Sequence, residues 1–304
     1  MNDTYRVRAG RRTLSVHRPD KVLFGDDGLT KADLAEYYRR IARYMVPELK
    51  GRPLMLERHP EGITAQPHFM QKDTPEHYPD WVHTTEVAKE GGTVRHTVCD
   101  DSATLVFLAD QACVSLHRWL STTAHLEAPD RLVFDLDPPG DDFGAVRHAA
   151  RLTKELLDEL KLPSMLMTTG SRGLHVTVPL DGRTSFDECH AFARDAAEVL
   201  AARDPGRLTT AVRKNRRGGR LYLDIQRNIY AQTAVAPWSV RARKGAPVAA
   251  PLPWDRLEDP GLTARSWSLR DVDAIMELAG SKPWSGTGRR RSLLAARQRL
   301  TKLR

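Results

Sequence analysis

The sequence predicts an α/β or mixed α+β fold, because segments with strand and helix periodicity alternate through its central part. Residues 131–137 (RLVFDLD) have the two-residue alternation of a strand, and apolar residues then recur at helical spacing over roughly 143–160. Two further strand-like runs, SMLMTT and LHVTVPL, flank a short turn at 170–173. Another helix is expected after Ser185, with Glu188 as the partner in its capping box.

An amphipathic helix is also expected in the N-terminal part, beginning after Thr30. Thr30 and Asp33 have the spacing of a capping box, and apolar side chains recur at helical intervals as far as Met45. Pro47 lies near the expected end of this helix. Residues 51–83 are rich in Pro, His and aromatic side chains without a sustained period, which predicts a short strand and then a long surface loop.

The composition limits the class of protein and its partners. The chain has 304 residues, enough for one large domain or two closely associated ones, and 40% hydrophobic with 28% charged residues is typical of a folded protein. Lys and Arg (47) exceed Asp and Glu (39) by 8, and the isoelectric point near 9.5 favours a polyanionic partner such as nucleic acid. No run approaches the ~18 apolar residues of a membrane helix and no secretory signal is evident, so a cytoplasmic protein without membrane contact is expected.

The three cysteines, Cys99, Cys113 and Cys189, are widely spaced along the chain. This spacing provides neither a disulfide framework nor a CxxC zinc ribbon. We therefore expect all three to be reduced and buried as small hydrophobic side chains.

Three aspartates are candidates for a metal-binding catalytic centre. Asp135 and Asp137 are two residues apart on a strand, so both side chains project from one face with their Cα atoms about 7 Å apart. Carboxylates so placed can share divalent ions, which in polymerases and nucleases activate a hydroxyl and stabilise the leaving group. Asp224, on the segment GGRLYLDIQ, is positioned to be the third ligand. The alternative is a strand end with solvated carboxylates, although a central strand that buried them would need a cationic partner.

The segment TTGSRGLHV joins two expected strands, and its small residues would let backbone N–H groups approach a triphosphate. Arg172 and His175 would add charge or hydrogen bonds there. A plain hairpin with a core histidine is the alternative. The segment lacks the G-x-x-x-x-G-K-[ST] pattern of a P-loop, and no Rossmann motif occurs, so neither an ATPase nor a dinucleotide site is supported.

Basic residues are concentrated in two runs, AVRKNRRGGR and SVRARKG, on either side of the Asp224 strand. These runs are either solvated surfaces or segments that bind nucleic-acid phosphates with salt-sensitive affinity. From Gly286 to Arg304 the chain carries basic residues and no acidic one. This last stretch is either a frayed basic tail or a helix lying along nucleic acid.

Taken together, these segments resemble the polymerase domain of bacterial ATP-dependent DNA ligase D, a member of the archaeo-eukaryotic primase-polymerase superfamily. The resemblance rests on the order and spacing of several motifs between residues of about 15 and 285. The motifs are HRPDKVLFGDDGLTKADLAEYYRRIA, GRPLMLERHPEGI, YPDWV, LHRW, RLVFDLDPP, TTGSRGLHVTVPL, YLDIQRN, TAVAPWSVRAR and APVAAPLPWDRL. The resemblance implies an α/β (α+β) primase-polymerase fold, with a two-layer catalytic core, a central sheet and flanking helices.

The resemblance also implies roles for residues at the catalytic centre. Asp135, Asp137 and Asp224 match the family's catalytic, metal-binding carboxylates. Where family members commonly have SGSKGLH, this chain has TGSRGLH, which keeps a positive charge but changes its geometry. The positions expected near the incoming nucleotide are His117, Ser171, Arg172, Gly173, His175 and Arg241.

Further positions are expected, from the same resemblance, to contact DNA. Lys21 and Lys31 match a pocket that binds the 5′-phosphate on the far side of a gap or break. A lysine before a helix and another in its first turn also suit a phosphate on general grounds. Arg217 and Arg227 match positions that place the primer and template, and Arg227 stands where a polar residue is common.

The activity implied by the resemblance is template-directed nucleotidyl transfer, extending primers across short gaps or bridged double-strand breaks in non-homologous end joining. Two divalent metal ions, Mn²⁺ or Mg²⁺, and a preference for ribonucleotides are expected. The expected partners are DNA with gaps or breaks, NTP or dNTP, a separate ATP-dependent DNA ligase and a Ku-type end-binding protein. The separate ligase is expected because the sequence contains no ligase lysine motif.

A single catalytic domain is expected over residues 1–285, with an N-terminal part to about 125 and a catalytic core over about 126–250. The basic tail at 286–304 would follow it. Two other functions remain open. One is a metal-dependent nuclease or phosphodiesterase that uses the same carboxylates, and the other is a non-catalytic module that binds DNA ends.

Overall fold

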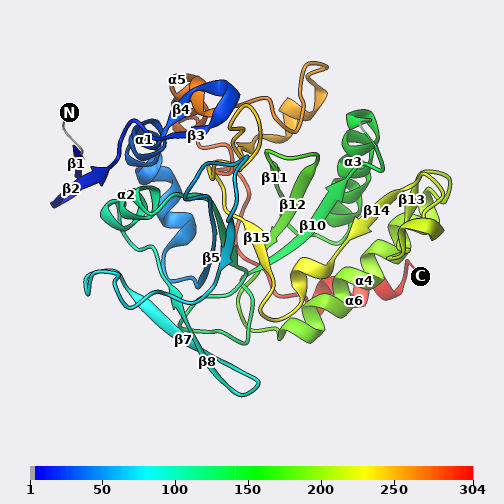
Figure 1. Ribbon diagram of the computed structural model, residues 1–304. Coiled ribbons are helices and arrows are strands. Elements are labelled where there is room, and N and C mark those ends of the chain that lie inside the picture. Colours follow the sequence, from blue (N-terminus) through cyan, green and yellow to red (C-terminus); the bar gives the residue numbers. More distant parts are fainter. Residues whose placement is uncertain (1–3, 141, 304) are drawn as a thin grey trace. The chain divides into compact units, whose positions relative to one another are not determined.

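The computed structural model describes residues 4–140 and 142–303 (Figure 1). The chain divides into two compact units. The first unit contains the chain up to Trp119 together with Thr233–Ala250 and Trp267–Ser281. The second contains Leu120–Gln232, Pro251–Ser266 and the chain from Lys282 onward. Each unit is therefore assembled from separate stretches of sequence.

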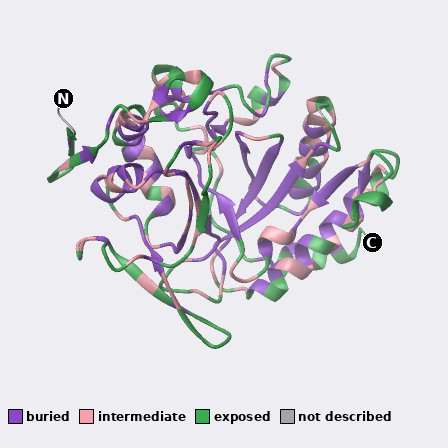
Figure 2. Cartoon of the chain, viewed as in Figure 1, coloured by how far each residue is buried: buried purple, intermediate pink, exposed green. Residues whose placement is uncertain are grey.

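A six-stranded sheet forms the centre of the second unit, in the order β13-β14-β10-β12-β11-β16. Neighbouring strands are antiparallel except for the parallel pair β13 and β14. Strands β10, β11 and β12 are buried along nearly their whole length (Figure 2). The strands span β10 (Arg131–Asp137), β11 (Met165–Thr168), β12 (Leu174–Pro179), β13 (Leu208–Thr209), β14 (Leu221–Asp224) and β16 (Pro251–Leu252).

Helices α3 (Phe143–Glu159) and α4 (Phe186–Arg203) pack against each other and against β10. The predicted capping box at the start of α4 is confirmed: the Ser185 side chain accepts from the backbone N–H of Glu188, and the Glu188 side chain accepts from the backbone N–H of Ser185. Together the sheet and these helices confirm the predicted α/β (α+β) class. Short 3₁₀ helices lie at Lys214–Arg216 (η2), Gln226–Asn228 (η3) and Trp254–Glu258 (η4).

The first unit contains a four-stranded sheet in the order β15-β9-β5-β6. Helix α1 (Lys31–Leu49) begins with the predicted capping box of Thr30 and Asp33, and its predicted apolar stripe is buried. The sheet strands are β5 (Leu54–Arg58), β6 (Phe69–Gln71), β9 (Cys113–Trp119) and β15 (Thr233–Val235). The other elements are β1 (Thr4–Ala9), β2 (Arg12–His17), β3 (Val22–Phe24), η1 (Gly25–Asp27), β4 (Leu29–Thr30), β7 (Thr84–Lys89), β8 (Gly92–Thr97), α2 (Ser102–Asp110), η5 (Leu269–Asp271) and α5 (Val272–Gly280).

The prediction for residues 51–83 was incomplete. The expected short strand is β5, but the segment after it also forms β6, which pairs with β5 instead of remaining a surface loop. Because the alternation of β6 covers only three residues, with exposed Phe69 and Met70, it produces no detectable period. Strand pairing between segments more than ten residues apart, rather than local pattern, determines this element.

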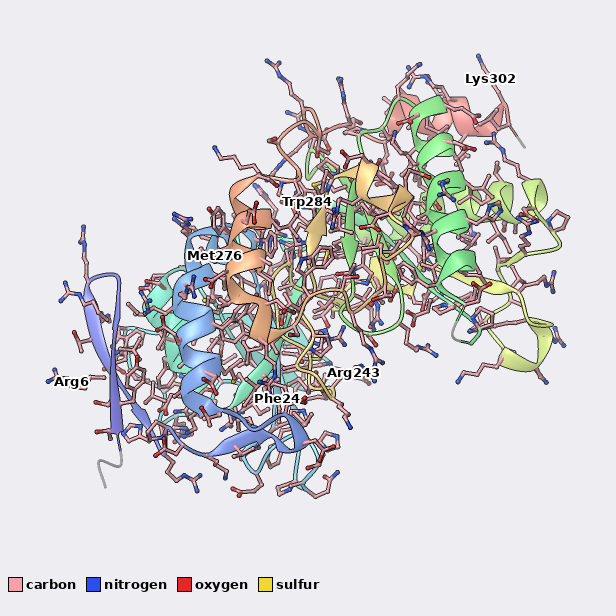
Figure 3. All side chains as sticks on the ribbon, turned by 90° about the horizontal axis from the view of Figure 1, so that it is seen from above. Arg6, Phe24, Arg243, Met276, Trp284 and Lys302 are labelled. Carbon is pink, nitrogen blue, oxygen red and sulfur yellow. The ribbon has the colours of Figure 1, made fainter. Side chains whose placement is uncertain are left out.

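The basic C-terminal stretch forms a helix, α6 (Leu294–Thr301), which packs against α4 through buried Ala296 and Leu300. Lys302 is exposed and extends away from the end of the helix (Figure 3). Arg304, the last residue of the predicted tail, lies outside the described residues. The stretch is therefore anchored to the second unit by its buried apolar residues and by hydrogen bonds from Arg297 to the Glu188 carbonyl (2.8 Å) and from Arg299 to the Leu160 carbonyl (3.1 Å).

The three cysteines are buried and unpaired, as predicted. None of the helices within residues 4–140 and 142–303 combines the length and the apolar character that crossing a membrane requires.

Candidate active site

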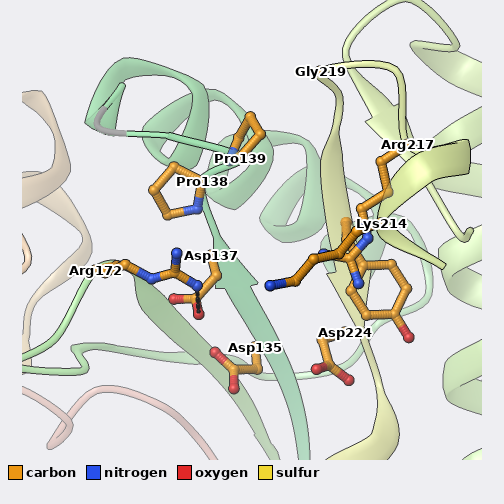
Figure 4. Close-up of a pocket in the computed structure, with 10 residues that line it drawn as sticks. Asp135, Asp137, Pro138, Pro139, Arg172, Lys214, Arg217, Gly219 and Asp224 are labelled. Atoms are coloured by element: carbon orange, nitrogen blue, oxygen red, sulfur yellow. Dashed lines mark hydrogen bonds and ion pairs between the residues drawn. The ribbon is translucent and has the colours of Figure 1, made fainter. Parts of the chain in front are cut away.

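The three predicted aspartates line one pocket of the second unit, with a volume of about 350 Å³ (Figure 4). Asp135 on β10 lies directly opposite Asp224 on β14 in the antiparallel register, and Asp137 follows two residues further along β10. Facing residues of antiparallel strands project from the same side of the sheet with Cβ atoms about 5 Å apart. The strand pattern of the sequence thus places all three carboxylates at one end of adjacent strands.

Asp135 occupies the centre of this arrangement, because His175 on β12 is its partner on the other side. One carboxylate oxygen of Asp135 lies 3.4 Å from His175 Nε2 and the other lies 3.2 Å from Arg227 Nε. Burial alone would raise the pKa of Asp135, but the charges and hydrogen bonds of His175 and Arg227 outweigh burial and hold the pKa at about 2. Asp135 is therefore ionised although only 7% of the residue is exposed.

The other two carboxylates have different surroundings. Burial raises the pKa of Asp224, and the nearby charge of Asp135 raises it further, although the backbone N–H of Gln226 donates to Asp224 at 2.8 Å and opposes the shift. Asp137 forms a 3.0 Å ion pair with Arg172, in which both side chains are about half exposed. Asp135 and Asp224, which face each other across the two strands, thus repel each other, and a bound cation would relieve that repulsion.

The donor set fits a hard divalent cation. Asp135, Asp137 and Asp224 supply only carboxylate oxygens, the ligands that Mg²⁺ and Mn²⁺ prefer. Within residues 4–140 and 142–303, no three His, Cys, Asp or Glu side chains already converge on one point as a metal cage. The three carboxylates instead contact Arg227, Arg172 and a backbone N–H. A metal ion bound there would compete with these protein partners for the carboxylate oxygens.

The predicted turn at residues 170–173, here called the glycine loop, is folded by Thr169, which directly follows β11. The Thr169 hydroxyl accepts hydrogen bonds from the backbone N–H groups of Ser171 (3.3 Å) and Gly173 (3.2 Å) and donates to the Gly173 carbonyl (3.1 Å). Gly173 passes so close to β10 that a Cβ atom there would lie 1.9 Å from the Leu136 carbonyl oxygen and 2.7 Å from Asp137 Oδ1. The loop is thereby held against the catalytic strand, and its Arg172 reaches the pocket.

The basic run before Asp224 forms the opposite wall of the pocket. Lys214 points from this wall into the pocket, and Arg217 lies beside it (Figure 4). The Arg217 guanidinium stacks 4.1 Å from the ring centre of Tyr222 and donates to the carbonyls of Ala211 and Val212. Arg217 therefore stabilises the fold of its own loop while its charge remains at the pocket.

His117 and Arg241, two of the residues expected near the nucleotide, belong to the first unit. His117 lies on β9 opposite Met55 of β5. The hydroxyl of Ser115, two residues earlier on the same strand, accepts from the backbone N–H of Ala242 at 3.1 Å. The segment containing Arg241 is thereby fixed beside the strand containing His117.

Glu57 is an acidic residue that the sequence analysis did not single out, and it interacts with His117. Its two carboxylate oxygens lie 3.3 Å from His59 Nε2 and 3.8 Å from His117 Nε2. Burial alone would raise the pKa of Glu57, but the polar groups of His117, His59 and Ser115 around it outweigh burial and lower the pKa well below its ordinary value. The sequence signal that could have identified Glu57 is its position directly after the apolar residues LML of a predicted strand.

Replacing Glu57 by glutamine is expected to lower the free energy of unfolding by about 2 kcal/mol at pH 7, because charge-assisted hydrogen bonds are lost. A carboxylate whose pKa is lower in the folded state stabilises the fold above its unfolded pKa, and that stabilisation is lost as pH falls through the folded value. The difference between wild type and Glu57→Gln, measured by urea unfolding, should therefore shrink below about pH 4.5. A difference that stays constant from pH 7 to pH 3 would contradict this assignment.

Lys21 and Lys31 of the expected 5′-phosphate pocket are held together in the first unit by a backbone hydrogen bond from Lys31 N–H to the Lys21 carbonyl (2.9 Å). The Lys21 ammonium pairs with Glu61 at 2.6 Å. Lys31 is buried, with its ammonium 3.4 Å from Asp110. Burial lowers the pKa of Lys31, and the positive charges of Arg18 and Lys21 lower it further. The charge and hydrogen bond of Asp110 act in the opposite direction and raise it. A phosphate at Lys21 would compete with Glu61 for the ammonium group.

Several residues that organise the pocket had no distinctive sequence signal. Thr169 stands just before the glycine loop at the end of the strand-like run SMLMTT, and Lys214 is one cation among several in its run. The buried Asn228 side chain binds the backbone of Val133 through both its oxygen and its nitrogen, which fastens η3 to β10. The roles of Thr169, Lys214 and Asn228 are evident only from their contacts and positions in the folded protein.

Comparison with known proteins places the chain in one family. Residues 30–284 match the family described as LigD, primase-polymerase domain. The multifunctional non-homologous end joining DNA repair protein LigD of Mycobacterium tuberculosis is 32% identical over 290 residues, which cover 90% of this chain and 38% of that protein. The multifunctional non-homologous end joining protein LigD of Pseudomonas aeruginosa is 32% identical over 295 residues, covering 96% of this chain and 35% of that protein. The chain thus spans little more than a third of the length of these relatives.

A solved structure supports the same assignment. The polymerase domain of Mycobacterium tuberculosis ligase D, determined in complex with DNA, matches with a TM-score of 0.81 and 30% sequence identity. The match covers 89% of this chain and 95% of that chain. From the family match, the relatives and this fold, we conclude that the chain belongs to the LigD primase-polymerase domain family.

Proposed function

We propose that the chain is a template-directed nucleotidyltransferase that adds nucleotides to a primer at gaps and breaks in DNA. The observation that carries this proposal is the row formed by Asp224, Asp135 and His175 across three adjacent strands, with Asp137 beside it. Basic side chains from the glycine loop and from the run before Asp224 face these carboxylates across the pocket. A site with clustered carboxylates and surrounding cations suits the transfer of a phosphoryl group between oxygen atoms.

Asp135, Asp137 and Asp224 would hold the two divalent ions, Mn²⁺ or Mg²⁺. When bound, such ions lower the pKa of the attacking 3′-hydroxyl and neutralise charge on the leaving pyrophosphate. The protein's own contribution is to position the carboxylates: β10 carries two of them in one orientation, and β14 presents the third in direct register. Little covalent chemistry is then required of the protein beyond positioning and charge neutralisation.

The triphosphate would bind between the two basic walls of the pocket. Arg172 and Lys214 supply charge from opposite sides, and Ser171 and Gly173 would offer the backbone of the glycine loop. We further propose, from the family resemblance, that His175, His117 and Arg241 contact the incoming nucleotide, and that residues 1–285 act together as one catalytic domain.

DNA is the proposed substrate, because the related polymerase domain was determined with DNA. In this proposal Lys21 and Lys31 recognise the 5′-phosphate across a gap, and Lys21 exchanges Glu61 for the phosphate. Arg217 and Arg227 would position the primer and template. Non-homologous end joining, named for the relatives, is the proposed setting, with a ligase and a Ku-type end-binding protein as partners.

A hydrolytic phosphodiesterase is the second candidate, because carboxylates alone do not choose between water and a 3′-hydroxyl as nucleophile. The basic walls of the pocket favour the polymerase, since a nuclease has no triphosphate to bind.

The proposal is tested by extension of a labelled primer across a short gap, with a downstream 5′-phosphate or 5′-hydroxyl, in Mn²⁺ with NTPs or dNTPs. We expect template-directed addition that is faster with the 5′-phosphate, and loss of this difference in Lys21→Gln. Asp135→Ala should be inactive on either substrate. A shortened primer would instead support the nuclease, and binding without any reaction would support a binding module.

A further inference from the structure

We infer that Arg227 is an internal counter-ion of Asp135 that competes with divalent cations and so weakens the metal affinity of the carboxylate pocket. The inference rests on the proposed function, in which Asp135 is a metal ligand. It assigns Arg227 a role before any nucleotide or DNA is bound, in addition to the proposed placement of primer and template.

The contacts of Asp135 carry this inference. Arg227 Nε lies 3.2 Å from Asp135 Oδ2, and His175 Nε2 lies 3.4 Å from Asp135 Oδ1. Each oxygen of this carboxylate therefore faces a basic group within the protein. Because the Asp135 side chain is only 9% exposed, water screens these contacts weakly. A cation that binds Oδ2 competes with the Arg227 guanidinium for that oxygen and is repelled by its positive charge.

The backbone of Arg227 is fixed, whereas its side chain is partly exposed. The neighbouring Asn228 side chain binds both backbone polar groups of Val133, at 2.8 and 2.7 Å, and also the Ile225 carbonyl. These bonds hold η3 against β10 and set the distance between Arg227 and Asp135. The Arg227 side chain is 41% exposed, so it can leave the carboxylate for solvent without a change in the fold.

The second arginine–aspartate pair of the pocket should matter less. Arg172 and Asp137 lie 3.0 Å apart, but their side chains are 53% and 41% exposed. Water screens such a pair and replaces its contacts when it opens, so exposed pairs contribute little. The dominant competition with a cation is therefore expected at Asp135.

The test measures Mn²⁺ binding in the absence of nucleotide and DNA, by electron paramagnetic resonance of free Mn²⁺ or by calorimetry. Arg227→Gln is expected to bind Mn²⁺ about tenfold more tightly than wild type, equivalent to about 1.4 kcal/mol. Lys214→Gln is the matched control, because it removes one positive charge from the same pocket. Within the described chain Lys214 forms no ion pair with a carboxylate, so less than a twofold change is expected. Arg227→Lys keeps the positive charge but loses the planar guanidinium, so its Mn²⁺ affinity should lie between those of wild type and Arg227→Gln.

The outcomes separate this inference from the proposed function. Equal tightening in Arg227→Gln and Lys214→Gln would mean that Arg227 adds only general positive potential, and weaker binding in Arg227→Gln would mean that it prepares the carboxylate; either overturns the inference. If Asp135→Asn binds Mn²⁺ as wild type does, the metal site itself is misassigned. Thermal unfolding of each variant verifies that the fold is retained.

Discussion

Replacing Asp135 by asparagine is expected to reduce nucleotide addition by about 10³-fold or more, equivalent to about 4 kcal/mol of transition-state stabilisation. The substitution preserves size but removes a negative charge from the centre of the carboxylate row, where Asp135 faces both Asp224 and His175. A neutral amide binds divalent ions more weakly and neutralises less of their charge. Single-turnover extension of a labelled primer at saturating nucleotide measures this effect directly.

Asp204→Asn is a matched control for that experiment. Asp204 also forms an ion pair with a histidine of the second unit, at 2.7 Å to His148, but it does not line the carboxylate pocket. The rate of nucleotide addition by Asp204→Asn is expected to stay within about twofold of wild type. Equal loss in the two variants would mean that Asp135 acts by stabilising the fold, and retained activity in Asp135→Asn would remove Asp135 from the catalytic centre.

Replacing Gly173 by alanine is expected to disrupt the same centre by steric means. The added Cβ would lie 1.9 Å from the Leu136 carbonyl oxygen, a backbone atom that can move only if β10 or β12 shifts. It would also press on Asp137 Oδ1 at 2.7 Å. We expect a loss of about 2–4 kcal/mol in the free energy of unfolding. Nucleotide addition should fall by at least 10²-fold, because small misplacements of catalytic groups are costly.

Gly286→Ala controls for the intrinsic effect of changing glycine to alanine. Apart from Gly286 itself and its two chain neighbours, no atom of the described residues lies within 4 Å of a Cβ built at this position. Its stability in urea unfolding should therefore match wild type within about 0.5 kcal/mol. If Gly173→Ala were as stable and as active as this control, the close approach of the glycine loop to β10 would be wrong.

Local sequence signals predicted the elements that depend on neighbouring residues. The capping boxes of Thr30 with Asp33 and of Ser185 with Glu188 are confirmed, because each is formed within four residues of backbone. The alternation in RLVFDLD likewise placed two aspartates on one face of β10, since the side chains of a strand alternate.

Contacts between distant residues could not be predicted in this way. Lys31 meets Asp110 across 79 residues of sequence, and Arg227 meets Asp135 across 92. No periodicity links such positions, since their distance is set by the packing of strands and helices. Strand β6 was likewise not predicted, because its pairing with β5 is set by packing and not by a local pattern. The resemblance to a known family implied roles for Lys31 and Arg227. It gave no indication that they pair with Asp110 and Asp135.

The most direct test of the central claim is to change one templating base and identify the nucleotide added opposite it. Single-turnover reactions with each of the four template bases, Mn²⁺ and all nucleotides would be followed by primer length and pyrophosphate release. We expect one nucleotide and one pyrophosphate per step, with the added base complementary to the template in all four cases and with addition by Asp135→Asn slower by about 10³-fold or more. Addition that ignores the template, or primer shortening without pyrophosphate, would contradict the account.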